Sequence, residues 1–258
     1  MHLFYHIDHT QWSLLAEDER REAKTNLTEL VREIRSTPDT HLLTFAVATP
    51  KADLGFMLLT PDLQVASQYE KQLTLSLGPD ILTPAYSYLS QTEGSEYTTT
   101  REQYAEETLV AEKQLRPGTP EFEAALGEFD ERMAHYLKHR LYPVLPDWPA
   151  ICFYPMSKRR SGADNWYSLP YDERRRLMAG HARTGRTYSG RILQLITGST
   201  GLDEHEWGVT LLAKDTSDIK SIVYEMRFDE VSARFAEFGD FYIGMQLPLD
   251  VLFRRVCL

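Results

Sequence analysis

Cysteine and long apolar runs are both scarce in this sequence. Only two cysteines, Cys152 and Cys257, occur in 258 residues, and they form no C-x-x-C pair that would indicate a zinc site or a redox dithiol. No stretch approaches the roughly 18 apolar residues of a membrane span. The first residues lack a basic segment followed by an apolar run, so we expect no signal peptide. These absences together predict a protein of the reducing cytoplasm.

Positive charge is also in deficit. The chain carries 28 Lys and Arg against 38 Asp and Glu, a formal net charge of -10, which disfavours nucleic acid as a partner. The cations are unevenly distributed, with groups at 158–160, 174–176 and 183–191. Such a concentration either binds a small anion or forms a solvated basic surface. With 42% hydrophobic residues, a chain of this length can form a core without disulfides.

Hydrophobic periodicity predicts the same order of elements twice, namely strand, helix, strand, strand, helix, strand. In the first half these are 2–7, 16–36, 41–48, 53–60, 62–77 and 86–92. In the second half they are 149–156, 170–182, 191–197, 207–213, 218–228 and a long strand over 231–245. This order is that of a repeated split βαβ unit. It predicts an α+β fold in which two ferredoxin-like (split βαβ) domains pack as a dimeric α+β barrel.

The two predicted halves are separated by an additional helix over 119–142 and by prolines between 143 and 149. We therefore expect an N-terminal ferredoxin-like domain at 1–110, a helical connection at 111–148 and a C-terminal ferredoxin-like domain at 149–258. Because this fold hosts many activities, it indicates no function by itself.

The predicted helix at 170–182 carries a candidate metal ligand. Pro170 suits its first turn, and Gly185 offers a C-terminal cap. His181 shares the apolar face with Leu177 and Met178. Such a histidine is either a core residue or an axial ligand to haem iron, a role for which imidazole is suited.

Two predicted strands carry polar groups on apolar faces. Gln194 lies between Ile192 and Ile196 on one face, and is either a hydrogen-bonded core residue or a polar group of a pocket. Tyr154 lies two residues before Met156 in the strand at 149–156, so the two share one face. Its ring is either a core side chain with a paired hydroxyl or a functional phenol.

Taken together, several stretches of the second half resemble the coproheme decarboxylases of the chlorite dismutase-like superfamily. They are Cys152-Phe-Tyr-Pro-Met-Ser-Lys-Arg-Arg160, Asn165-Trp-Tyr-Ser-Leu-Pro170, His181-Ala-Arg-Thr-Gly-Arg186 followed by Tyr188, Gly190 and Gln194, Glu206-Trp-Gly-Val-Thr-Leu211, and Tyr224-Glu-Met-Arg-Phe-Asp-Glu-Val-Ser-Ala-Arg234. The match covers about 140–244. The first half matches mainly in element order, with Tyr86-Ser-Tyr88 as a local similarity.

The resemblance implies haem in the C-terminal domain and a ring of five subunits, a homopentamer. His181 would be the proximal iron ligand, Gln194 would stand on the distal side, and Tyr154 would be the redox-active tyrosine. The groups expected to hold propionates are Arg140, Lys158, Arg186 and Ser232. Met156 and Trp166 would line the pocket, and Arg227 would have a structural or gating role.

The activity implied by the resemblance is the hydrogen-peroxide-dependent decarboxylation of iron-coproporphyrin III, or coproheme, to haem b. Two propionates become vinyl groups, with Tyr154 as the group that removes hydrogen and Lys158 as the cation that steers a carboxylate. The iron porphyrin would be both cofactor and substrate. A coproporphyrin ferrochelatase would be a partner upstream.

Three other functions stay open at this point. A chlorite dismutase would carry a distal arginine where this chain has Gln194, and a neutral amide does not hold an oxychlorine anion as a guanidinium does. A non-catalytic haem-binding or haem-transfer protein needs no oxidisable tyrosine such as Tyr154. A ferredoxin-like oligomeric module without haem would need none of these residues.

Overall fold

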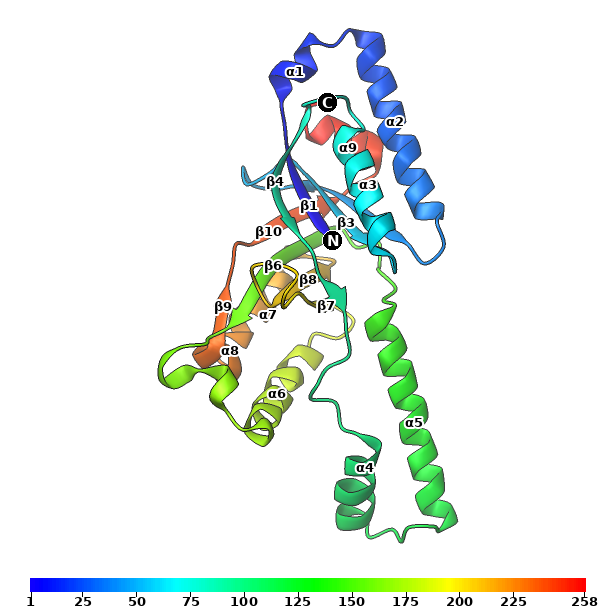
Figure 1. Cartoon of the computed structure of the whole chain (residues 1–258), viewed down its shortest axis with the longest axis vertical. Coiled ribbons are helices and arrows are strands. Elements are labelled where there is room, and N and C mark those ends of the chain that lie inside the picture. The colour runs from blue at the N-terminus through cyan, green and yellow to red at the C-terminus, as the bar shows by residue number, and fades with distance from the viewer.

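The first half of the chain forms one split βαβ unit in the computed structural model, which describes residues 1–258 (Figure 1). Its elements are β1 (His2–Ile7), α1 (His9–Leu14), α2 (Glu17–Ser36), β2 (His41–Val47), β3 (Leu54–Leu59), α3 (Leu63–Leu75) and β4 (Leu82–Tyr88). The strands lie in the order β4-β1-β3-β2, and every neighbouring pair is antiparallel. This arrangement confirms the predicted ferredoxin-like unit.

The second half repeats this arrangement. Its elements are β6 (Ala150–Lys158), the 3-10 turns η2 (Gly162–Asp164) and η3 (Trp166–Ser168), α6 (Tyr171–Arg186), β7 (Ile192–Gly198), β8 (Trp207–Ala213), α7 (Thr216–Met226), α8 (Glu230–Phe235), β9 (Ala236–Phe238), β10 (Tyr242–Gln246) and α9 (Leu249–Arg255). The order β10-β6-β8-β7 places the first strand between the third and the fourth, as in the first half. The final helix α9 returns to the core of the first half through Leu252 and Phe253.

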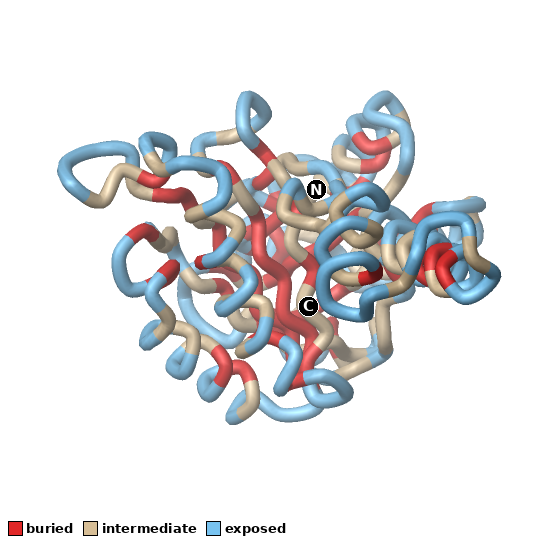
Figure 2. The backbone as a smooth tube through the Cα atoms, turned by 90° about the horizontal axis from the view of Figure 1, so that it is seen from below, coloured by how far each residue is buried: buried red, intermediate tan, exposed pale blue.

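The two units join into one sheet that curls round on itself. β10 pairs with β2, with Gly244 opposite Val47. β5 (Gln91–Thr92) follows β4 almost directly and pairs with β7, with Gln91 opposite Gly198. The path of strands therefore begins on β4 and ends on the continuation of the same segment, which gives the predicted barrel. Figure 2 shows the buried strands at the centre, surrounded by exposed helices and loops.

Strand β6 separates two cores by simple alternation. Ile151 and Phe153 belong to an interior cluster that also contains Phe4, Phe45 and Tyr242 from the other strands. The side chains at 152 and 154 point to the opposite face, where they pack with the α7 residues at 219 and 222. The even-numbered positions of β6 therefore face the helices of the second half.

The connection between the halves is helical. α4 (Arg101–Gln103) continues into a π-helix, η1 (Tyr104–Glu112), and α5 (Pro120–Leu141) follows. These helices project from the end of the molecule opposite α1 and α2 (Figure 1). Leu109, Phe122 and Leu126 form their small core. The predicted helix at 119–142 is confirmed, whereas the π-helix was not predicted. The domain bounds at 110 and 148 stay a prediction, since one sheet runs through both halves.

The predicted long strand at 231–245 is wrong. Residues 230–235 form α8, because the Asp229 side chain accepts from the backbone N–H of Ser232 and caps a new helix. Two short strands follow, at 236–238 and 242–246. The predicted cap at Gly185 is also wrong, because α6 continues to Arg186. None of the helices is long and apolar enough to span a membrane.

Candidate functional site

Asp229 joins two of the predicted site residues. Its Oδ2 atom lies 2.9 Å from Nδ1 of His181 on α6, and it accepts a 3.1 Å hydrogen bond from the hydroxyl of Ser232 on α8. Its Oδ1 accepts from the Ser232 backbone N–H at 3.0 Å. Burial raises the pKa of Asp229. The hydrogen bond and charge of His181 and the two hydrogen bonds from Ser232 lower it by more, so the net pKa is below its usual value. Asp229 is therefore an anion at neutral pH.

This contact determines which histidine nitrogen is available. An ionised carboxylate can only accept, so Nδ1 of His181 carries a hydrogen, and in the neutral imidazole the lone pair is on Nε2. A histidine that binds a metal through one nitrogen usually donates the other N–H to a carboxylate or carbonyl. The His181 side chain is 27% exposed, which leaves it accessible. The sequence motif contained Asp229, but its role was not predicted.

Lys158 is a buried cation at the end of β6, with 7% of its surface exposed. Its Nζ lies 4.9 Å from the centroid of the Trp166 ring, which is buried and packs edge-on against Phe235. Burial lowers the pKa of Lys158 to about 8, although Asp229 and Glu206 raise it in part. Lys158 is thus a protonated, partly desolvated ammonium at neutral pH, close to the anion that holds His181.

Glu206 is a second residue whose role the sequence did not indicate. It is buried, and its Oε2 accepts from the Lys158 backbone N–H at 2.7 Å. Its own N–H donates to the carbonyl of Met156 at 3.1 Å. Glu206 precedes β8 by one residue, so it holds the end of β6 in place. The motif at 206–211 was recognised, but the carboxylate was not assigned.

Tyr154 is buried on the same face of β6 as Met156. Its ring stacks on Phe241 at 4.4 Å between centroids and lies 5.7 Å from Phe238, over which the Arg227 guanidinium sits at 4.8 Å. Burial raises the pKa of Tyr154, Cys152 adds to the rise, and Arg227 opposes it. The phenol is therefore neutral across the physiological range, and its hydroxyl has no protein hydrogen-bond partner, unlike that of its cluster neighbour Tyr188.

Gln194 contacts the end of the helix that carries His181. Its Nε2 donates to the carbonyl of Gly185 at 3.0 Å. A Cβ at Gly185 would lie 3.3 Å from Gln194 Nε2 and 3.3 Å from Met226 Cε, so glycine allows the close approach of α6 to β7. Gln194 is therefore hydrogen-bonded and partly exposed, and its place in a pocket stays a prediction.

The structure does not bring two of the predicted arginines to this cluster. Arg140 lies at the end of α5, where its Nε donates to the carbonyl of Glu93 at 3.2 Å. Arg186 is exposed at the last position of α6. The structure does link His181 to Ser232 through Asp229, and Lys158 to Trp166 and Glu206. Tyr154 and Met156 lie on the same face of β6, the strand that ends at Lys158.

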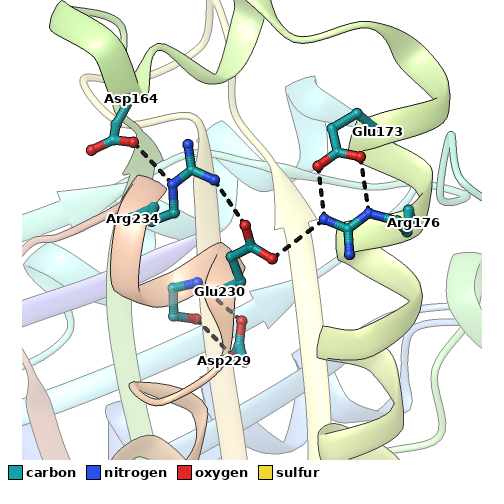
Figure 3. Close-up of polar contacts among 7 residues, drawn as sticks. Asp164, Glu173, Arg176, Asp229, Glu230 and Arg234 are labelled. Atoms are coloured by element: carbon teal, nitrogen blue, oxygen red, sulfur yellow. Dashed lines mark hydrogen bonds and ion pairs between the residues drawn. The ribbon is translucent and has the colours of Figure 1, made fainter.

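The basic run at 174–176 is mostly engaged in ion pairs. Figure 3 shows Arg176 of α6 between Glu173 and Glu230, at 2.7 and 3.3 Å, and Arg234 of α8 between Glu230 and Asp164, at 2.8 and 3.0 Å. Single exposed ion pairs contribute little to stability, but networks hold geometry better. This network ties α6 to α8, and so fixes the two elements that carry His181 and Ser232.

The fold and the site define a two-unit α+β barrel with a carboxylate-bound histidine beside a buried lysine and a buried tyrosine. Residues 20–247 match the family model described as chlorite dismutase, and the chain belongs to this family. The family contains haem-dependent oxidoreductases.

Solved structures agree with this assignment. A haem-binding protein from Thermus thermophilus is 38% identical, with 100% of this chain and 94% of that chain covered and a TM-score of 0.81. A chlorite dismutase from Candidatus Nitrospira defluvii in complex with imidazole is 18% identical, with 100% and 94% covered and a TM-score of 0.71. At this lower identity the second likeness shows the fold alone.

Proposed function

We propose that this protein binds coproheme and uses hydrogen peroxide to convert two of its four propionates to vinyl groups, which gives haem b. One observation carries the proposal. Asp229 holds His181 and Ser232 together beside the buried Lys158. Tyr154 and Met156 share one face of β6, the strand that ends at Lys158. On this proposal His181 would be the metal ligand, Lys158 the cation that binds a carboxylate, and Tyr154 the oxidisable phenol.

The donor set fits an iron porphyrin that carries carboxylates. Nε2 of His181 would bind the iron, with Asp229 orienting the ring. Lys158 and Ser232 would hold propionates, and Met156 and Trp166 would contact the porphyrin. The haem-binding description of the neighbour at 38% identity supports the same class of ligand. When bound, the iron porphyrin supplies the redox chemistry, and the protein supplies position and electrostatics.

Tyr154 would carry the hydrogen transfer. Because its phenol keeps its proton at neutral pH, oxidation of the ring must release a proton with the electron. The phenoxyl then takes a hydrogen atom from the propionate carbon β to the carboxylate, and loss of carbon dioxide with one further electron gives the alkene. Each decarboxylation balances as R–CH2–CH2–COO⁻ + H2O2 + H⁺ → R–CH=CH2 + CO2 + 2 H2O.

Lys158 would fix the carboxylate that is lost. A compact ammonium on a desolvated site binds a carboxylate strongly, and positioning is where such a reaction gains rate. Gln194 remains our proposal for the distal side, and Arg140 and Arg186 remain proposals for outer propionates. On this proposal a coproporphyrin ferrochelatase supplies the substrate, and the protein acts in the cytoplasm as a homopentamer.

A non-catalytic haem-binding or haem-transfer role is the second candidate, because the neighbour at 38% identity is described as a haem-binding protein. A buried tyrosine whose hydroxyl has no protein partner favours the catalytic role. Chlorite dismutation is less well supported, because the amide of Gln194 is neutral and donates to a helix carbonyl.

One experiment separates these functions. Ferric coproporphyrin III is added to the purified protein, hydrogen peroxide is titrated in, and the porphyrin mass is followed. Loss of two formic-acid equivalents, each CO2 plus two hydrogens, supports the decarboxylase. A haem spectrum with unchanged mass contradicts it and supports carriage. His181→Ala should alter the ferric spectrum or lose the porphyrin; if it does neither, His135, His139 and His205 are the next ligands to test.

A further inference from the structure

Two histidines face each other on α5, the long helix between the two halves. His135 and His139 are separated by one helical turn, and their Nε2 atoms lie 3.1 Å apart, with ring centroids 4.3 Å apart. Both side chains are exposed, so neither ring is forced toward the other by burial. Side chains at i and i+4 of a helix lie on the same face, which is what brings the two nitrogens together.

The spacing of the two nitrogens suits a shared metal ion. With Zn–N bonds of about 2.0–2.1 Å, two nitrogen ligands lie about 2.9 Å apart at a right angle and about 3.3 Å apart at a tetrahedral angle. The observed 3.1 Å falls between these values. Neutral imidazole is a good ligand for zinc, copper and nickel ions. In the structure the two Nε2 atoms share one hydrogen bond, and a metal ion bound by both would take the place of the shared proton.

The surroundings of the pair favour a cation. Glu131 lies one turn before His135, and both line an open surface depression with His139. Glu131 has no ion pair in the structure, whereas its neighbour Asp130 is bound to Arg101. Arg132, which lines the same surface, is directed over the rings of Tyr104 and Phe129. A free carboxylate thus adds negative potential on the histidine face.

We propose that His135 and His139 form a binding site for a divalent transition-metal ion, with copper(II) bound more tightly than zinc(II). No group of three or more His, Cys, Asp or Glu side chains is arranged around a metal position. The two imidazoles therefore leave positions on the ion open to water or to a donor from another molecule. Such a site is exchangeable, unlike a structural zinc site with its four closed ligands.

The test is a calorimetric titration of the full chain, free of porphyrin, with CuCl2, ZnCl2 and MgCl2. We expect one Cu²⁺ ion bound per chain at this site, weaker binding of Zn²⁺, and none of Mg²⁺, which prefers oxygen ligands. His135→Gln and His139→Gln should each weaken this event by about tenfold or more, because the second imidazole binds at high effective concentration only when both are present. His41→Gln, at another exposed histidine, should leave it unchanged.

A register control separates chelation from the mere number of imidazoles. The double change His139→Gln with Leu137→His keeps two histidines on α5 but places them at i and i+2, which do not face each other. This variant should bind Cu²⁺ as weakly as His139→Gln alone. In the parent protein, electron paramagnetic resonance of bound Cu²⁺ should show couplings to two equivalent nitrogens. The proposal would be overturned if the parent bound no Cu²⁺. It would also be overturned if a His135→Gln, His139→Gln double variant of unchanged helicity bound Cu²⁺ as tightly as the parent.

Discussion

The Oδ2 atom of Asp229 and the Nδ1 atom of His181 lie 2.9 Å apart and link the cap of α8 to the last turns of α6. The two residues are 48 positions apart in the sequence. The same carboxylate both begins a helix and orients an imidazole. A change at Asp229 should therefore affect the porphyrin site and the local fold in ways that can be separated.

For Asp229→Asn we expect porphyrin affinity to fall by about 10–100-fold, which is typical when the partner of a metal-bound histidine is removed. Asparagine keeps the volume and can still cap α8 through its carbonyl oxygen. Absorbance titration with ferric coproporphyrin measures the effect. The control is Asp250→Asn, which removes an exposed partner of Arg254. An affinity for Asp229→Asn equal to that of the control would show that the carboxylate does not support the ligand.

Tyr154→Phe should bind ferric coproporphyrin normally and form no vinyl groups with peroxide. The variant keeps the stacking on Phe241 but lacks the transferable hydrogen. Because the hydroxyl has no protein partner, we expect little change in stability. Mass spectrometry of the porphyrin is the readout. Tyr188→Phe is the matched control, since this ring belongs to the same cluster and its hydroxyl bonds Glu225 at 2.6 Å. Haem b formed by Tyr154→Phe at the parent rate would make Tyr154 a packing residue.

Porphyrin affinity should decrease as pH rises through about 8. Lys158 has a folded-state pKa of about 8, lowered from 10.5 mainly by burial, so its charge and its hold on a carboxylate are lost above that pH. The effect of Lys158 on folding stability has the opposite pH dependence. Between about 8 and 10.5 the unfolded chain binds more protons than the folded one, so this residue makes folding more favourable as pH rises. Porphyrin titrations from pH of about 7 to about 9.5, a range that brackets the folded-state pKa of Lys158, should show this decrease in affinity. Lys158→Met should abolish the decrease. The same decrease in that variant would assign the pH dependence to another group.

Glu206→Ala should destabilise the fold by about 1–3 kcal/mol, because it leaves the buried N–H of Lys158 without an acceptor. Urea unfolding measures this cost. We expect decarboxylation to fall as well, since the end of β6 that carries Lys158 is no longer held. Glu204→Ala serves as the control, because that carboxylate is exposed and lies two residues away. Equal stability of the two variants would contradict the role of Glu206.

Chlorite should give negligible oxygen with the porphyrin-loaded protein. The side chain at 194 is a neutral amide that donates to the Gly185 carbonyl, so it provides no fixed cation for an oxychlorine anion. An oxygen electrode records the result. Many turnovers per haem would show that another group, such as Arg186 at the end of α6, supplies the charge.

Local patterns predicted most of the fold because the signals are local. Strand alternation and helix periodicity act over a few residues, so the order of elements in both halves followed from the sequence. The segment 231–245 did not, because its apolar positions fit a strand while the cap by Asp229 starts a helix. The bond that commits Asp229 to this position also involves His181, which is distant in sequence. Periodicity carries no information about such a contact.

The sequence alone determined the repeated βαβ order, the shared face of Tyr154 and Met156, and the family resemblance around His181. Each depends on spacing along the chain, which folding preserves. Only the tertiary structure decided that Asp229 pairs with His181, that Glu206 holds Lys158, and that Arg140 lies apart at the end of α5. These are contacts between separate elements. Their distances depend on how the sheet closes and how α6 and α8 pack, and no local pattern encodes them.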